Sequence, residues 1–252
     1  MAIDLSQLEK PTGQRPIIIT LFGEGGQGKT TLAAMFPKPV FIRTEDGMAS
    51  LQGNENVSMF PLANSTQDVL DGIEALATQE HDYKTLVLDS ITQLATMIEH
   101  EIVASDPKAK SINQAGGGYG AGYGAASEKH RQIREWAGAL AYEKGMNVVF
   151  IGHADVETMD LPDMDQYNRY SVRLRKKSIA HYTDNVDAVC MVRLKTFVRS
   201  GEGDKKKAVS TQEREIICYP QAASVTKNRF NITEPLPFTF DGGNPFDQWA
   251  AK

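Results

Sequence analysis

The chain has 252 residues and a formal net charge of −5, and 41% of its residues are hydrophobic. A chain of this length and composition can bury one large α/β core. The mild negative charge excludes a protein that coats nucleic acid through an overall positive field. Any polyanion must therefore be bound by local basic clusters.

The apolar runs and the cysteines indicate the cellular compartment in which the protein is expected. The longest apolar runs are far shorter than the ~20 residues that a bilayer span needs, and the N-terminus lacks the apolar segment of a signal peptide. We therefore expect a cytoplasmic protein that makes no contact with a membrane. Cys190 and Cys218 do not have metal-ligand spacing, which predicts a reduced, buried pair.

Four strands are expected along the chain after a polar, loosely ordered lead-in over residues 1–15. Each is a short apolar run rich in β-branched residues, typical of a strand that is buried on both faces. The expected strands are 16–22, 39–43, 85–90 and 147–152.

Helices are expected between these strands. Residues 30–36 begin the first, and Ser65 with Asp68 three residues later predicts a capping box at the start of the second. Apolar residues at helical spacing then predict the inward faces of three helices. These residues are Val69, Leu70, Ile73 and Leu76; Ile91, Leu94, Ile98 and Ile102; and Ile133, Trp136, Ala137 and Leu140.

The pattern changes after the fourth strand, where residues 187–198 and 213–219 predict an antiparallel hairpin. The sequence therefore predicts an α/β fold with a predominantly parallel sheet and a C-terminal antiparallel hairpin extension. We expect one domain over residues 16–240, followed by a C-terminal tail over 241–252.

The segment "GEGGQGKT" fits the P-loop pattern G-x-x-x-x-G-K-[ST] and lies between a buried strand and a helix start. Glycines allow backbone N–H groups to turn toward phosphates, the lysine reaches the outer phosphates, and the threonine hydroxyl binds Mg²⁺. The pattern predicts a site for ATP and Mg²⁺. The nucleotide-binding residues are expected to be Gly23, Glu24, Gly25, Gly26, Gln27, Gly28, Lys29, Thr30 and Thr31.

Two carboxylates are expected beside this loop. Asp89 ends an apolar strand, as a Walker B aspartate does, and is predicted to hold the metal together with Thr30. Many ATPases place a glutamate directly after this aspartate, but Ser90 stands there. Glu45, just past the end of the second strand, is the predicted base because strand C-termini converge on the ligand edge of a parallel sheet.

In this motif order, residues 16–240 resemble the RecA-like ATPase family. The resemblance is greatest to the compact core-only AAA/RecA-type nucleotide-binding proteins of bacteriophages, which are linked to single-strand annealing and recombination. "VVFIGHADVE" resembles the strand that ends in a γ-phosphate sensor, here His153. "TKNRF" is similar to the element that reaches across a subunit boundary, which implies that Lys227 and Arg229 act on a neighbour's triphosphate.

The resemblance also implies two loops that bind single-stranded DNA, in a homo-oligomeric ring or filament, with a single-strand binding protein as a further partner. The first would be the glycine-rich stretch 113–126, where Tyr119 and Tyr123 can stack on bases. The second would be 154–178, whose first half is acidic. Its basic half contains Arg169, Arg173, Arg175, Lys176 and Lys177.

Three other functions share the P-loop. A P-loop kinase of a small molecule would be expected to have an arginine-rich lid instead of a C-terminal Lys-Asn-Arg segment. A partition-type ATPase would have a lysine where Glu24 stands. A nucleotide-dependent scaffold or loader in a replication complex would use the same residues and differ only in its output.

Overall fold

The computed structural model describes residues 15–200 and 206–252. Nearly all of the expected lead-in, residues 1–14, lies outside the described residues, as do residues 201–205 of the hairpin tip. Six strands form the parallel part of the sheet. They are β1 (Ile18–Gly23), β2 (Pro39–Arg43), β3 (Ser58–Leu62), β4 (Thr85–Asp89), β5 (Asn147–Met159) and β7 (Ala188–Ser200).

Four antiparallel strands complete the sheet: β6 (Tyr167–Val172), β8 (Lys206–Ile217), β9 (Lys227–Asn228) and β10 (Leu236–Phe238). The strand order is β10-β8-β7-β1-β5-β4-β2-β3, with β6 paired to β5 and β9 paired to β7. The predicted α/β fold, with its mostly parallel sheet and C-terminal antiparallel strands, is therefore confirmed. β1 lies near the centre of this order, so the loop that follows it emerges from the middle of the sheet.

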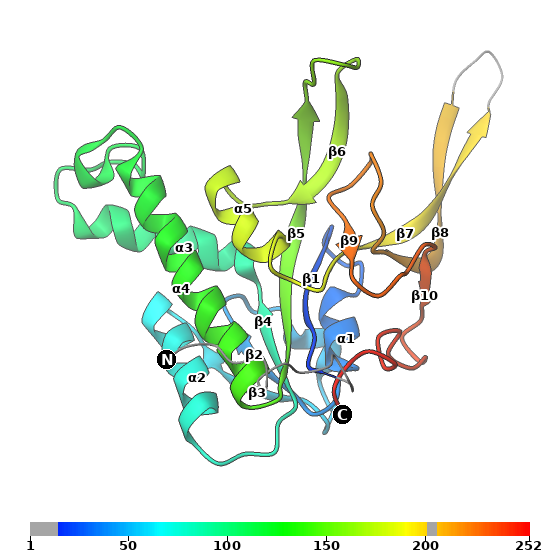
Figure 1. Cartoon of the computed structure of the whole chain (residues 1–252), viewed down its shortest axis with the longest axis horizontal. Coiled ribbons are helices and arrows are strands. Elements are labelled where there is room, and N and C mark those ends of the chain that lie inside the picture. Colours follow the sequence, from blue (N-terminus) through cyan, green and yellow to red (C-terminus); the bar gives the residue numbers. More distant parts are fainter. Residues whose placement is uncertain (1–14, 201–205) are drawn as a thin grey trace, which may run out of the picture.

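Helices lie on both faces of the sheet (Figure 1). The helical elements are α1 (Lys29–Ala34), η2 (Met48–Leu51), α2 (Thr66–Thr78), α3 (Ile91–Ser105), η3 (Ala115–Gly117), α4 (Ala121–Glu143) and α5 (Lys176–Thr183). The side chains of α2, α3, α4 and α5 contribute to one apolar cluster, whereas α1 and the C-terminal segment contribute to the other. Within residues 15–200 and 206–252, no helix is long and apolar enough to cross a bilayer.

The two faces of β1 illustrate why the sequence gives this sheet. Ile18 and Phe22 belong to the first apolar cluster, and Ile19 and Leu21 belong to the second. Because successive strand residues point to opposite faces, a run of apolar residues can serve both clusters at once. The continuous apolar run in the sequence is thus the direct consequence of helices on both faces.

The predicted helix features are confirmed with one exception. The Ser65–Asp68 capping box is present at the start of α2, and the predicted inward residues of α2 are buried. Trp136 was expected to face inward on α4, but 41% of its surface is exposed. Position 136 lies at the border of the apolar stripe, where a large side chain can lie along the protein surface.

Two segments expected as loops contain regular structure. The glycine-rich stretch 113–126 includes η3 and the first turns of α4, so Tyr123 is helical. Most of 154–178 is not a loop, because β5 continues to Met159 and pairs with β6 in an antiparallel hairpin. This hairpin and the β7–β8 hairpin extend beyond the sheet in the same general direction (Figure 1).

The segment 241–252, expected as a tail, packs against the core. Phe246 is fully buried and stacks on Phe36 at the end of α1, with ring centroids 6.0 Å apart. Asn147 Nδ2 donates a hydrogen bond of 2.9 Å to the backbone oxygen of Ala251. The C-terminal residues therefore cover the face of the sheet that carries α1. Cys190 and Cys218 are both free and buried, as the sequence predicted.

Candidate nucleotide site

The phosphate loop leaves β1 at Gly23 and enters α1 at Lys29. Gly26 and Gly28 have φ angles of +74° and +92°, a region that favours glycine. A Cβ atom on Gly28 would lie 2.7 Å from the ring of Phe240, so a side chain there would need both a strained backbone and a shift of that ring. These two glycines allow the turn that the P-loop pattern predicted.

Lys29 is buried at the start of α1. Its ammonium donates hydrogen bonds to the backbone oxygens of Gly23, at 3.0 Å, and Glu24, at 2.8 Å. Burial lowers the pKa of Lys29, and the nearby carboxylates of Asp89 and Glu45 partly oppose this effect. The lysine side chain thus joins the two ends of the loop and places a positive charge inside it. A phosphate-binding loop needs such a charge.

Thr30 and Asp89 meet between the loop and β4. Thr30 Oγ1 donates a hydrogen bond of 2.8 Å to Asp89 Oδ2. Asp89 is only 4% exposed, and burial raises the pKa of its carboxyl group. A hydroxyl and a buried carboxylate in contact are the donor set that Mg²⁺ shares with nucleotide phosphates. Within the described ranges no group of three or more His, Cys, Asp or Glu side chains forms a metal site, so a cation here needs ligands from a bound phosphate.

Glu45 and His153 form a pair at the same edge of the sheet. His153 Nε2 lies 3.2 Å from Glu45 Oε1, and both side chains are about one-third exposed or less. The hydrogen bond from His153 is the main cause of a lowered pKa at Glu45. The predicted base and the predicted sensor are therefore in contact, with the base held as a carboxylate.

Two threonines that the sequence analysis did not single out position this edge. Thr44 Oγ1 donates to the backbone oxygen of Ser90 at 2.7 Å and accepts from its N–H at 2.9 Å, which ties the end of β2 to the end of β4; the Asp89–Ser90 peptide bond is cis. Thr92 Oγ1 accepts a hydrogen bond of 2.9 Å from the backbone N–H of His153. Their only sequence signal was their place beside the strand ends.

Phe238 and Phe240 were likewise not predicted as site residues. Their rings pack edge to face, with centroids 5.6 Å apart, against Gly28. The guanidinium of Arg214 lies over the Phe240 ring, 4.2 Å from its centroid. The rings form one wall of a cavity of about 770 Å³ that also involves Pro237, an apolar surface that suits the stacking of a base.

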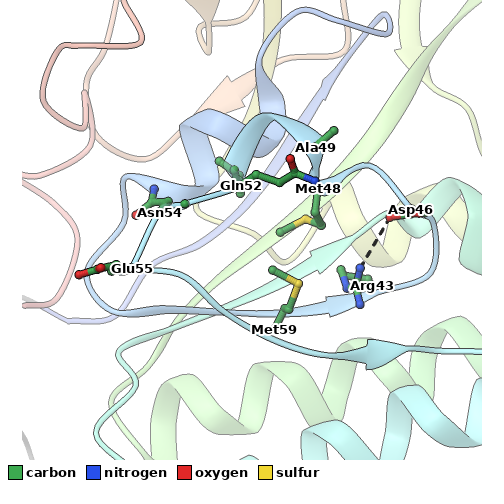
Figure 2. A pocket seen from close by; sticks show the side chains of 10 residues that line it. Arg43, Asp46, Met48, Ala49, Gln52, Asn54, Glu55 and Met59 are labelled. Carbon is green, nitrogen blue, oxygen red and sulfur yellow. Dashed lines mark ion pairs between the residues drawn. The ribbon is translucent and has the colours of Figure 1, made fainter.

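A second cavity lies beside η2 and is separate from the phosphate loop. It has a volume of about 500 Å³ and is lined by residues of β2, η2 and β3. Figure 2 shows the side chains of Met48 and Met59 facing one another across it, with the Arg43–Asp46 ion pair of 3.8 Å to one side. None of the nine phosphate-loop residues lines this cavity.

Lys227 and Arg229 lie near the amino-terminal ends of β1 and β7, whereas the phosphate loop lies at the carboxyl-terminal end of β1. Lys227 Nζ donates a hydrogen bond to the backbone oxygen of Asp184, and Arg229 forms an ion pair of 3.4 Å with Asp187. Burial and the neighbouring charge of Arg229 lower the pKa of Lys227. The two cations thus lie near the start of β7 and not at the phosphate loop of their own chain.

The expected DNA-contacting residues lie on or just before three elements, α4, β6 and α5. Arg175 lies over the ring of Tyr123, 5.3 Å from its centroid, and forms an ion pair of 3.1 Å with Glu99. Arg169 pairs with Glu157 across the β5–β6 hairpin at 2.6 Å. The other members of the set are exposed: Tyr119, Arg173, Lys176 and Lys177. The two predicted segments therefore meet through Tyr123 and Arg175, although carboxylates neutralise part of the positive charge.

A glycine loop that surrounds a buried lysine, next to a threonine–aspartate pair at the end of a parallel strand, defines a P-loop NTPase. Residues 15–230 match the family described as AAA domain, and the chain belongs to this family. A comparison with curated proteins gave no match. Family, fold and site agree on a nucleotide-binding P-loop protein of the ATPase type.

We expect Gly28→Ala to weaken nucleotide binding by tenfold or more, on the order of 1.4 kcal/mol. The new methyl group must displace Phe240, and the alanine must adopt the positive φ of Gly28. Gly25→Ala is the matched control in the same loop, because nothing lies within 4 Å of its Cβ position and its φ is not positive. Titration of a fluorescent ATP analogue measures both variants, and equal losses would contradict the steric explanation.

We expect His153→Ala to raise the pKa of Glu45, because it removes the hydrogen bond that stabilises the carboxylate. In the wild-type chain Glu45 remains ionised until the pH falls below the usual glutamate range. An NMR titration of the Glu45 side-chain carboxyl measures this pKa. His100→Ala, on the exposed surface of α3, is the control, and an unchanged Glu45 pKa in His153→Ala would show that the pair does not form.

Proposed function

We propose that the chain is a RecA-like, Mg²⁺-dependent ATPase that acts on single-stranded DNA in phage recombination or replication. Its active sites are completed between the subunits of a homo-oligomer. The observation that carries the proposal is the Glu45–His153 pair, because His153 is in register with Gly23 and so holds a hydrogen-bonded carboxylate beside the start of the phosphate loop.

Hydrolysis needs a positioned water molecule and stabilisation of negative charge. In this proposal Glu45 accepts a proton from the water that attacks the γ-phosphorus, and the bond from that phosphorus to the bridging oxygen of ADP breaks. Lys29 holds the outer phosphates, and His153 orients the Glu45 carboxylate. Thr30 and Asp89 would hold Mg²⁺, which neutralises charge on the β- and γ-phosphates.

The position of Arg229 supports a role in trans. Its backbone N–H donates to Asp187, which in turn hydrogen-bonds Ile18 at the start of β1. Ile18 and Gly23 lie at opposite ends of this strand, about 16 Å apart at ~3.3 Å per residue. Arg229 therefore cannot reach the phosphates of its own chain, and a triphosphate that it serves must belong to a neighbour.

The contact between Tyr123 and Arg175 supports a single surface for DNA. A ring and a guanidinium plane both stack on unpaired bases, and the exposed lysines Lys176 and Lys177 suit the phosphate backbone. Tyr119 is fully exposed and has a positive φ of 52°. An exposed ring on the turn that leads into the helix carrying Tyr123 suits stacking on a single strand.

We expect an equimolar mixture of Lys29→Ala and Arg229→Ala to recover ATP turnover that neither variant has alone. Lys29→Ala lacks a working phosphate loop, and Arg229→Ala lacks the arginine finger. Where the two variants meet, the intact loop of Arg229→Ala can face the intact Arg229 of Lys29→Ala, which gives a complete site. An arginine finger contributes on the order of 10³–10⁵ in rate, so the recovered signal is large.

The control is a mixture of Lys29→Ala with the double variant Lys29→Ala/Arg229→Ala, which cannot form a complete site. Turnover is measured across a range of total protein concentration. Arg229→Ala should retain ATP binding, because Arg229 lies far from its own phosphate loop. Full turnover by Arg229→Ala alone, independent of concentration, would contradict shared sites.

We expect Tyr119→Ala to weaken binding of single-stranded DNA by about tenfold, because base stacking on an aromatic ring contributes about 1–3 kcal/mol per base. Tyr142→Ala, which removes an exposed tyrosine from the other end of α4, is the matched control. Fluorescence anisotropy with a labelled oligonucleotide measures both, at two salt concentrations. If Tyr119→Ala and the wild-type chain bind the oligonucleotide with equal affinity, Tyr119 does not contact DNA.

A further inference from the structure

Arg173 lies closer to the phosphate loop than its place in the basic segment suggests. It follows β6 directly, its backbone N–H donates to His153 at 2.8 Å, and its Nη2 donates to the backbone oxygen of Ala154 at 2.9 Å. His153 is the register partner of Gly23 in the β1–β5 pair. Two strand-to-strand steps of about 4.8 Å each therefore separate Arg173 from the start of the phosphate loop.

The charge of Arg173 is not neutralised locally. Arg169 and Arg175, its neighbours in the same basic segment, each form an ion pair with a glutamate. Across residues 15–200 and 206–252, Arg173 forms no ion pair within 4.0 Å, and its side chain is exposed. The positive charge also extends to the loop, since Arg173 contributes to the lowered pKa of Lys29.

Space is available on this side of the site. A cavity of about 370 Å³ lies between α3 and the β5–β6 hairpin, and Arg173 lines it together with Thr92, Thr96 and Asp155. Thr92 is the residue that holds the backbone of His153. Through Thr92, the wall of this cavity is hydrogen-bonded to the backbone of His153, and Arg173 borders open space on this side of the site.

We propose that Arg173 binds the terminal phosphate of the nucleoside triphosphate held by its own chain. This proposal rests on the proposed function, in that the ligand of the phosphate loop is a triphosphate. A guanidinium forms two parallel hydrogen bonds with phosphate oxygens, which a backbone carbonyl cannot match. Arg173 leaves the Ala154 oxygen when the terminal phosphate is present and returns to it when only a diphosphate remains.

The movement of Arg173 between the Ala154 oxygen and the terminal phosphate would also affect the β5–β6 hairpin and the residues that follow it. Arg173 joins β6 to the segment that carries Arg175, Lys176 and Lys177. A contact with the terminal phosphate therefore fixes the Arg173 side chain, two residues before Arg175, in one nucleotide state and releases it in the other. By linkage, a single strand that favours the fixed arrangement must raise the affinity for the triphosphate by the same factor.

The test measures affinity for a non-hydrolysable ATP analogue and for ADP, without DNA, in the wild-type chain and in Arg173→Ala. We expect the variant to lose about tenfold or more in affinity for the analogue and to bind ADP as before, because a charge-assisted contact with one phosphate is removed. Arg173→Lys keeps the charge and should retain part of the preference for the analogue. Arg131→Ala removes an exposed arginine on α4 and is the matched control.

Three results would overturn the assignment: an unchanged affinity for the analogue, equal losses for the analogue and ADP, or a loss of DNA affinity alone. Circular dichroism melting shows whether each variant is folded, and Arg173→Gln replaces Arg173→Ala if the alanine variant is not. Failure of the wild-type chain to bind either nucleotide would instead reject the proposed function itself. The two failures are thus distinguishable in one set of titrations.

Discussion

Two opposite charges are buried at the carboxyl edge of the parallel sheet, and the site depends on how they are held. Lys29 and Asp89 are 7% and 4% exposed, although burial disfavours the charged form of each. Isolated buried charges are costly unless they are hydrogen-bonded or paired. Here backbone oxygens satisfy the lysine, and Thr30 satisfies the aspartate. The arrangement suits a nucleotide bound with a cation, in which the phosphates meet Lys29 and the cation meets Asp89.

The features that could be predicted from the sequence are those that local spacing determines. The phosphate loop is contiguous, so its glycines, lysine and threonine can be recognised together. The capping box of α2 needs only Ser65 and Asp68, three residues apart. Buried strands such as β4 are recognisable because both of their faces are apolar. In each case the physical cause lies within a few residues of chain.

The features that could not be predicted depend on contacts between distant segments. Glu45 and His153 lie 108 residues apart, and each was assigned a role separately without the contact between them. The packing of Phe240 on Gly28 joins the C-terminal segment to the phosphate loop, and no local pattern indicates it. Residues 154–178 were expected to form a loop because the resemblance to RecA-like ATPases implies one after the sensor strand. The β5–β6 hairpin found there is a polar two-stranded extension, which lacks the alternation that identifies a half-buried strand.

The two ends of β1 have different functions in the proposed assembly. Gly23 at its carboxyl end begins the phosphate loop, whereas Ile18 at its amino end holds Asp187 and, through it, Arg229. A contact in which Arg229 of one subunit meets the phosphate loop of the next joins two different surfaces. Such a contact is heterologous, and repeating it gives a closed ring or an open filament, whereas a two-fold dimer pairs the same surface of both subunits. In the proposed assembly the sheet separates Arg229 from the phosphate loop of its own chain, so a complete site would need a neighbour and turnover would depend on assembly.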